Sequence, residues 1–199
     1  MNSFIENLHR SFSKNSNNIC LSIENENYYY KDVLSISEQI RQQLQDASSQ
    51  NIGVYLTDDV FMYASILAIW LEGKTYVPIH PDFPLNKNKS VVEQAEIETI
   101  LSSIEIKENF GISIIDSTKD FGAEITPPKD SSLQTNAYIL FTSGSTGTPK
   151  GVPIQFSNLY YFSEAFHTTF GKLTSDDCVL QMFELTFDLS VMSYLIPWL

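Results

Sequence analysis

The spacing of hydrophobic residues changes several times within the first eighty positions. Between 33 and 44, apolar residues recur at three- and four-residue intervals, which is typical of an amphipathic helix. A short apolar run at 52–56 predicts a strand, and the apolar stretch at 61–71 predicts a buried helix. The next extended piece is expected at 76–79. This part of the chain is therefore predicted to form a βαβ unit.

Two aspartates stand in the turn between the first predicted strand and the buried helix. Either Asp58 or Asp59 can cap that helix, because a carboxylate accepts hydrogen bonds from the free N–H groups of the first turn. The turn is poor in glycine. A dinucleotide-binding fingerprint needs several glycines at this position, so a Rossmann domain is not predicted.

The middle of the chain has shorter and weaker patterns. A helix is expected to begin near Ser90 and to run through 91–95, followed by short strands at 97–101 and 112–115. Segment 124–132 contains two adjacent prolines with polar neighbours. It is the best candidate for an internal linker.

Aromatic side chains are concentrated in one predicted helix, which Ser157 and Asn158 begin and Gly171 closes. Aromatic residues in such a helix are expected to belong to the core rather than to a cofactor site. His167 among them is expected to be a packed or surface histidine. The aromatic residues are Tyr160, Tyr161, Phe162, Phe166 and Phe170.

Apolar and polar residues alternate strictly from 183 to 190, which favours an extended segment with one face in the core. The polar face would then point to a cleft and would aim Asp188 at it. Glu184 lies on the same face. It is interpreted as a solvated charge in preference to a second acidic group of a pocket.

Hydroxyl groups, glycines and one lysine follow directly after an apolar run at 138–141. Backbone N–H groups near the glycines can approach phosphate oxygens without a Cβ in the way, while hydroxyls add donors and the lysine adds a cation. A surface turn would need only one or two such residues. The pattern therefore predicts a polyphosphate-binding loop. Its residues are Thr142, Ser143, Gly144, Ser145, Thr146, Gly147, Thr148 and Lys150.

The residues around the lysine exclude a Walker loop, in which the lysine leads straight into a helix. Pro149 precedes Lys150, and a second proline lies in the following segment 151–154. Proline disfavours a helix there and suits an extended segment. The expected arrangement is strand, loop, strand.

The run Tyr-x-x-x-Thr-Ser-Gly-Ser-Thr-Gly-x-Pro-Lys-Gly-Val at 138–152 resembles the signature loop of the adenylate-forming enzymes. These include acyl-CoA synthetases, luciferases, adenylation domains of nonribosomal peptide synthetases and D-alanine:carrier-protein ligases. The resemblance implies that the loop wraps the β- and γ-phosphates of ATP while a carboxylate attacks the α-phosphate, which gives an acyl-adenylate and pyrophosphate. It also implies an α/β fold, with residues 1–199 forming the N-terminal part of the large domain, built of mixed sheets with flanking helices. In the family, segment 124–132 would only bridge two sheets of one domain.

Two further segments resemble family elements in the same order. Segment 30–33 resembles a Tyr-x-Glu-Leu element that opens an amphipathic helix. Segment 70–81 resembles the Leu-Lys-Ala-Gly-Gly-Ala-Tyr-Val-Pro-Ile-Asp-Pro element of amino-acid-activating members, with His80 in place of the usual aspartate. That element is mainly structural, so we expect the replacement to change local hydrogen bonding, and we do not expect a metal ligand.

Segment 187–190 resembles the Phe-Asp-x-Ser element of the amino-acid activators. The resemblance implies that Asp188 holds the α-ammonium group of the substrate. A partly desolvated carboxylate pairs strongly with an ammonium and rejects substrates that lack one. The alternative role for Asp188 is the N-cap of a helix at 190–195, and both roles can hold together.

The resemblance as a whole implies an enzyme that uses ATP and Mg²⁺ to activate an amino acid and passes it to the phosphopantetheine thiol of a carrier protein. One rival is an acyl- or aryl-CoA ligase acting on another small carboxylic acid, which Asp188 argues against, because such substrates bring no ammonium. Another is a truncated nucleotide-binding remnant without catalysis. The family is much longer than 199 residues. We therefore expect the catalytic lysine beyond Leu199 and expect these residues alone to be inactive.

Composition and charge narrow the possible binding partners and the expected location of the protein. The net charge of −12 argues against nucleic-acid binding, which relies on clustered lysine and arginine. The longest apolar stretch, at 61–71, is too short for a membrane span, and the N-terminus does not resemble a secretory signal, so the cytoplasm is the expected location. Cys20 and Cys178 lack the spacing of a metal site and are expected to be reduced, partly buried thiols.

Overall fold

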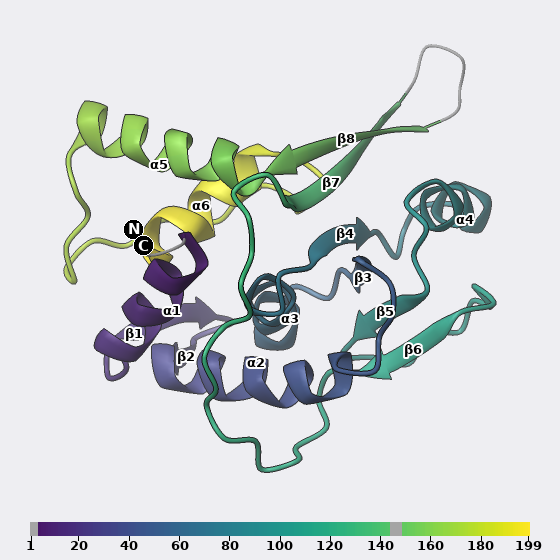
Figure 1. The fold of residues 1–199 in the computed structure, drawn as a ribbon, viewed down its shortest axis with the longest axis horizontal. Coiled ribbons are helices and arrows are strands. Elements are labelled where there is room, and N and C mark those ends of the chain that lie inside the picture. The colour runs from purple at the N-terminus through teal and green to yellow at the C-terminus, as the bar shows by residue number, and fades with distance from the viewer. Residues whose placement is uncertain (1–3, 144–148) are drawn as a thin grey trace.

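The computed structural model describes residues 4–143 and 149–199, with helices and strands alternating through much of the chain (Figure 1). The helices are α1 (Phe4–Lys14), α2 (Tyr30–Leu44), α3 (Val60–Leu71), α4 (Leu85–Gln94), α5 (Phe156–Phe170) and α6 (Leu189–Trp198). The strands are β1 (Ile19–Ile23), β2 (Glu26–Tyr29), β3 (Asn51–Tyr55), β4 (Thr75–Ile79), β5 (Thr99–Ser102), β6 (Ser113–Asp116), β7 (Asn136–Ser143) and β8 (Pro149–Gln155).

A six-stranded sheet with the order β6-β5-β3-β4-β7-β8 forms the centre of the fold. Its strands are parallel except for β8, which pairs with β7 in the antiparallel direction. Strands β3 and β4 pair in parallel from Asn51↔Thr75 to Tyr55↔Ile79, with α3 between them in the chain. The predicted βαβ unit and the α/β fold are therefore confirmed.

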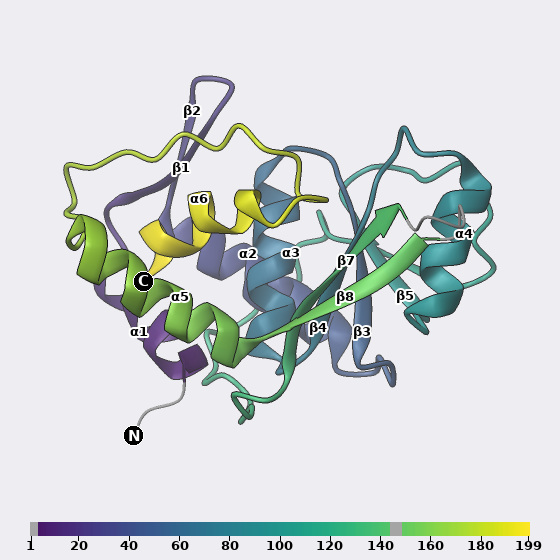
Figure 2. The ribbon, with the colours of Figure 1, turned by 90° about the horizontal axis from the view of Figure 1, so that it is seen from above.

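Helices cover both faces of this sheet, because each strand sends alternate side chains to opposite sides. Val54 of β3 belongs to the core that contains α2, α3 and α6, whereas the neighbouring Tyr55 belongs to a second core under α4. Figure 2 shows α3 and α4 with the strands of the sheet between them. The buried helix α3 begins at Val60, where the Asp59 carboxylate accepts a hydrogen bond from the Met62 N–H at 2.9 Å. The predicted cap is confirmed for Asp59.

The N-terminal region contains two features that the hydrophobic pattern did not predict. Helix α1 buries Phe4, Ile5, Leu8 and Phe12 in the main core. The β1–β2 hairpin follows, and its turn places Glu24 and Asn25 at positive φ. Its strands are short and largely exposed, so they lack the run of buried residues on which the other strand predictions depended.

Helix α4 begins five residues earlier than predicted, at Leu85 instead of Ser90. Pro84 precedes the helix, and its carbonyl oxygen accepts hydrogen bonds from the Lys87 and Asn88 N–H groups. In the first turn the only apolar residue, Leu85, is exposed and is followed by polar residues, so the turn has no apolar periodicity.

Segment 124–132 contains no helix or strand and connects β6 to β7 across three intervening strands. Both strands belong to one six-stranded sheet, so the expectation that the segment joins two sheets is wrong here. The carbonyl oxygens of Thr126 and Pro127 accept hydrogen bonds from the buried Arg41 guanidinium at 3.0 and 2.9 Å. The segment is thus fixed to α2, and its role as a linker stays a prediction.

Helix α5 corrects the expectation that its aromatic residues form a core. It buries only Phe156, Leu159 and Ser163, while most of the aromatic side chains after Leu159 are exposed. Phe170 is 75% exposed and Tyr161 67%. His167 is half-buried, consistent with a packed or surface histidine.

Candidate functional site

The carboxyl ends of the parallel strands lie at one edge of the sheet, which is where ligands bind in many open α/β folds. His80 follows β4 at this edge, and the predicted phosphate loop follows β7. The β3–α3 turn also begins here. Ser103 follows β5, and its hydroxyl donates a hydrogen bond to the Asp59 carboxylate and lies within hydrogen-bond distance of the Thr57 hydroxyl in that turn.

The β7–β8 hairpin brings the two ends of the predicted phosphate loop together. Thr142 pairs with Lys150 in the ladder, and Ser143 pairs with Pro149. The side chains of Thr142 and Lys150 are exposed, so a hydroxyl donor and an ammonium stand side by side at the loop end of the hairpin. The strand, loop, strand prediction is confirmed for the two strands. Gly144, Ser145, Thr146, Gly147 and Thr148 lie outside the described residues.

Gly151 has a packing role that the sequence did not show. It pairs with Phe141 across the hairpin, and a Cβ at this position would lie 3.0 Å from the Phe141 ring and 3.1 Å from Ile139. That distance is too short for a side chain without local movement. A glycine here leaves room for the Phe141 ring against β8, beside Lys150.

Helix α6 is anchored to the sheet by aromatic side chains. The Tyr194 and Tyr76 hydroxyls lie 2.8 Å apart, and the Trp70 indole N–H donates to the Ala137 carbonyl at 2.9 Å. Tyr194 also contacts Trp70 and Trp198 with ring centroids 6.1 and 5.0 Å apart. These contacts join α3, β4 and α6, and they fix the position of the residue that precedes α6.

Asp188 is that residue. It occupies the N-cap position of α6 with helical backbone angles, φ −62° and ψ −28°, and its side chain makes no capping hydrogen bond. The carboxylate is exposed and therefore available to a ligand. Burial and the nearby Asp188 carboxylate together raise the pKa of Tyr138, which places Asp188 near the strand that continues to Thr142. The alternative role as a side-chain cap is not observed.

The predicted extended conformation of 183–190 is wrong. The Phe187 N–H donates to the Glu184 carbonyl, and the Ser190 N–H and hydroxyl both donate to the Phe187 carbonyl. These bonds wind the backbone into turns that lead directly into α6. Leu185 is buried, but Phe187 is 60% exposed, so the alternating pattern does not produce an apolar face in the core.

Glu184 has a partner that sequence reasoning missed. Its carboxylate lies 3.7 Å from the His80 imidazole, between Oε2 and Nε2. The Glu184 side chain is 59% exposed, so the solvated interpretation is correct as far as burial is concerned. The signals in the sequence were that His80 departs from the family pattern and that Glu184 is an acidic residue close to Asp188, although nothing in the sequence placed the two together.

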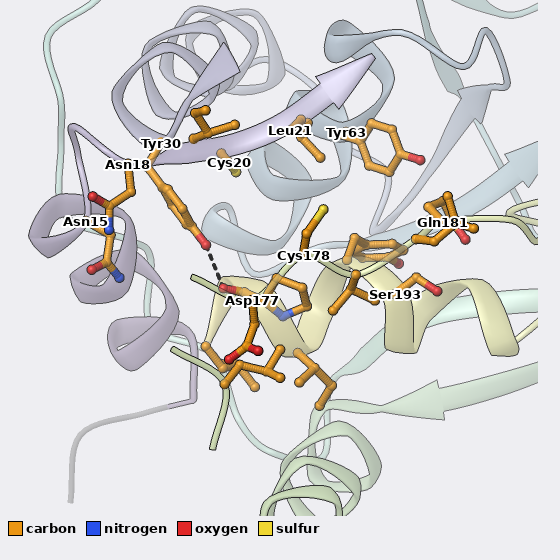
Figure 3. A pocket seen from close by; sticks show the side chains of 18 of the residues that line it. Asn15, Asn18, Cys20, Leu21, Tyr30, Tyr63, Asp177, Cys178, Gln181 and Ser193 are labelled. Atoms are coloured by element: carbon orange, nitrogen blue, oxygen red, sulfur yellow. Dashed lines mark hydrogen bonds between the residues drawn. The ribbon is translucent and has the colours of Figure 1, made fainter. Parts of the chain in front are cut away.

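A cavity of about 1530 Å³ lies elsewhere, between the β1–β2 hairpin, α5, α6 and the loop 172–185 (Figure 3). Burial raises the pKa of its Tyr63 to about 12, and the Tyr30 hydroxyl donates to the Pro197 carbonyl at its rim. Thr142, Lys150 and Asp188 do not line this cavity. Glu184 does line it, so the cavity reaches the loop that leads to Asp188.

Both cysteines line that cavity, although they are far apart in the sequence (Figure 3). Cys20 is partly buried, and burial raises the pKa of its thiol. Cys178 is exposed, which corrects the expectation of two partly buried thiols. Both are free, as predicted.

Two absences characterise the part of the chain that the structure describes. It contains no group of three or more His, Cys, Asp or Glu side chains that could hold a metal ion. No helix within it is long and apolar enough to cross a membrane.

Comparison with known proteins gives consistent matches over most of the chain. A family model described as AMP-binding enzyme matches residues 8–199. The chain is 31% identical over 179 residues to nonribosomal peptide synthetase 2 of Gibberella zeae, covering 85% of this chain and 4% of that protein. It is 26% identical over 188 residues to D-alanine–D-alanyl carrier protein ligase of Lactococcus lactis subsp. lactis, covering 88% of this chain and 37% of the ligase.

Solved structures share the fold. The Vibrio cholerae adenylation domain AlmE, in complex with glycyl-adenosine-5′-phosphate, matches with a TM-score of 0.81 and 19% identity, over 100% of this chain and 44% of that one. VinN in complex with L-aspartate matches with a TM-score of 0.85 and 19% identity, over 98% and 60%. The chain thus spans less than two thirds of each of these proteins.

Proposed function

Because this chain belongs to the AMP-binding enzyme family, we propose that it forms part of a ligase that activates an amino acid as an aminoacyl-adenylate. The adenylate would then pass to the phosphopantetheine thiol of a carrier protein in the cytoplasm. The observation that carries the amino-acid assignment is Asp188, an exposed carboxylate without a capping hydrogen bond, placed at the start of an anchored helix.

The chemistry requires the substrate carboxylate to attack the α-phosphorus of ATP. A new oxygen–phosphorus bond forms, the bond to the β-phosphate breaks, and pyrophosphate leaves with both electrons of that bond. Thiol attack on the mixed anhydride then forms a thioester, with AMP as the leaving group. No covalent intermediate with the protein is needed, so the protein contributes positioning and charge neutralisation.

Thr142 and Lys150 are the members of the proposed phosphate-binding set whose side chains the structure describes, and they fit a polyphosphate. A hydroxyl donor and an ammonium on adjacent strands can contact neighbouring phosphate oxygens. The same role is proposed for the residues between them in the chain, which are Ser143, Gly144, Ser145, Thr146, Gly147 and Thr148.

Mg²⁺ would neutralise charge on the phosphates when bound. This ion usually takes one or two protein carboxylates together with phosphate oxygens and water, so a site of three or more protein ligands is not required. The described residues are compatible with such a minimal protein contribution.

Asp188 would hold the α-ammonium of the amino acid. A charge-assisted hydrogen bond to a carboxylate selects substrates that carry an ammonium, because the carboxylate has no partner when the ammonium is missing. The names of the two relatives, a peptide synthetase and a carrier protein ligase, support this assignment.

Pyrophosphate exchange with the full-length protein tests the proposal. Amino acids and the carboxylic acids of the same shape without the α-amino group would be compared at equal concentrations. We expect exchange with at least one amino acid and little with its counterpart. Exchange only with carboxylic acids that lack the amino group would identify an acyl- or aryl-CoA ligase instead.

The 199-residue chain serves as a second sample in the same assay. We expect no exchange from it, because it spans 37% of the carrier protein ligase and 44% of the matched adenylation domain. Lys150→Met in the full-length protein should lower exchange, whereas Lys172→Met, at an exposed position on the loop after α5, should leave it unchanged.

A further inference from the structure

His80 and Glu184 form a contact between two regions that the proposed site needs in a fixed relation. His80 follows β4 at the carboxyl edge of the sheet. Glu184 lies on the loop that leads to Asp188. The Nε2 and Oε2 atoms are 3.7 Å apart, which is too long for a hydrogen bond but close enough for an N–H dipole to attract a carboxylate.

The His80 side of the contact is rigid. Its ring is 14% exposed and stacks on Phe83 with centroids 4.6 Å apart. Its Nδ1 accepts the Asp82 N–H at 3.1 Å, and its carbonyl oxygen accepts from the buried Asn88 side chain at 2.8 Å. With Nδ1 acting as an acceptor, the ring proton resides on Nε2 and faces the Glu184 carboxylate.

The Glu184 side leads to Asp188 through consecutive turns. The Glu184 carbonyl accepts the Phe187 N–H at 2.9 Å. The Phe187 carbonyl accepts the Ser190 N–H at 3.1 Å and the Ser190 hydroxyl at 2.6 Å. These backbone hydrogen bonds therefore couple the position of Glu184 to the position of Asp188, at the start of α6.

We propose that His80 and Glu184 are positioning residues that hold the Asp188 turn against the carboxyl edge of the sheet. The fixed Nε2–H group of His80 attracts the Glu184 carboxylate, and this attraction holds the turn at its first residue, Glu184. The significance of this contact for substrate binding rests on the proposed function, because Asp188 is the proposed ammonium partner. The contact itself can be tested without any substrate.

A double variant with exchanged charges distinguishes electrostatic attraction from passive packing, because it would restore only an electrostatic contact. His80→Asp places a carboxylate where His80 stands, and it keeps an acceptor for the Asp82 N–H, because Asx turns use this two-residue spacing. Glu184→Lys supplies the opposite charge. Each single substitution should remove the attraction, and the two together should restore an attraction, now as an ion pair between the carboxylate and the ammonium that the two changes introduce.

Amide hydrogen exchange of the 199-residue chain measures the result at Phe187 and Ser190, whose N–H groups close the turns. Glu184→Gln should speed their exchange by about two- to fivefold, as expected for one partly exposed pair. Glu105→Gln makes the same charge change at an exposed position on the loop after β5 and should leave both amides unchanged. The combined His80→Asp and Glu184→Lys variant should exchange more slowly than Glu184→Lys alone.

Unchanged exchange in Glu184→Gln, or a double variant that exchanges as fast as Glu184→Lys, would overturn the positioning role. Failure of the proposed function would be seen elsewhere, as amino-acid activation that does not depend on Asp188. The two failures are therefore distinguishable.

Discussion

Helices α3 and α5 both carry many large apolar and aromatic side chains, yet their surroundings are opposite. In α3 every residue except Phe61 is buried, and Trp70 is completely enclosed. In α5 the buried residues are Phe156, Leu159 and Ser163, and aromatic side chains face outward. The difference follows from topology: α3 lies between the sheet, α2 and α6, whereas α5 follows the edge strand β8. An apolar helix is therefore not necessarily a core helix within its own chain.

The largest expected effect is the loss of Trp70. Trp70→Ala removes a large side chain with 0% exposure and its hydrogen bond to the Ala137 carbonyl. We expect the free energy of unfolding to fall by about 3–5 kcal/mol, measured by urea denaturation. The matched control is Phe170→Ala on α5, where 75% exposure predicts a change within about 0.5 kcal/mol. Equal losses at both positions would remove the contrast between the two helices.

Arg41 is the next most sensitive position. Its guanidinium bridges the buried Glu38 and Glu72 at 2.6 and 2.9 Å and holds segment 124–132 through two carbonyl oxygens. Arg41→Met leaves two buried carboxylates without their shared cation, so we expect a loss of about 3 kcal/mol and faster proteolysis of the segment.

The control for Arg41 is Lys107→Met, which removes one cation from an exposed loop. It should change the free energy of unfolding by less than about 0.5 kcal/mol. A loss in Arg41→Met as small as that in the control would show that the segment is held by other contacts.

Gly53 tests the packing of β3 against β5. A Cβ at this position would lie 2.8 Å from Cγ1 of the buried Ile100. Gly53→Ala should therefore cost about 1–3 kcal/mol by overpacking. The cost should shrink when Ile100→Ala is already present, because the two substitutions share one contact. Additive losses in a double-mutant cycle would argue that backbone freedom of the glycine matters more than space.

The smallest effect on stability is expected on α5. Replacing the exposed Tyr161 and Phe170 with serine should change the free energy of unfolding by less than about 0.5 kcal/mol per site. Self-association should decrease, because exposed aromatic area promotes it. Sedimentation velocity measures association and thermal denaturation measures stability. A large loss of stability would show that α5 packs in solution through this face.

The sequence predicted the fold best where burial determines the structure. The strands and helices between 51 and 79 and the β7–β8 pair follow directly from apolar runs and prolines. Helix α1 was missed although its buried residues Phe4, Ile5, Leu8 and Phe12 recur at helical spacing. The β1–β2 hairpin was missed because its strands are short and largely exposed. Alternation at 183–190 predicted a strand, but none of the strands in residues 4–143 and 149–199 pairs with this segment, and local hydrogen bonds formed turns instead.

The candidate site was predictable in part. Thr142 and Lys150 were expected together, and the antiparallel register places them opposite one another. The contact between His80 and Glu184 could not be predicted, because it depends on how the loop before α6 returns to the end of β4. Asp188 lies at the N-cap position of a helix, as the alternative role predicted. Its carboxylate makes no capping hydrogen bond, which supports the proposed function.

Asp188→Asn in the full-length protein tests the central claim most directly, with pyrophosphate exchange as the measurement. The substitution keeps the size of the side chain and removes its charge, and Asp46→Asn at an exposed site after α2 is the control. Amino-acid-dependent exchange should fall by the value of one charge-assisted hydrogen bond, roughly 1.5–3 kcal/mol or 10- to 150-fold, while exchange with the same carboxylic acid lacking the amino group should barely change. Equal losses with both substrates, or no loss with either, would contradict the assignment of Asp188 as the ammonium partner.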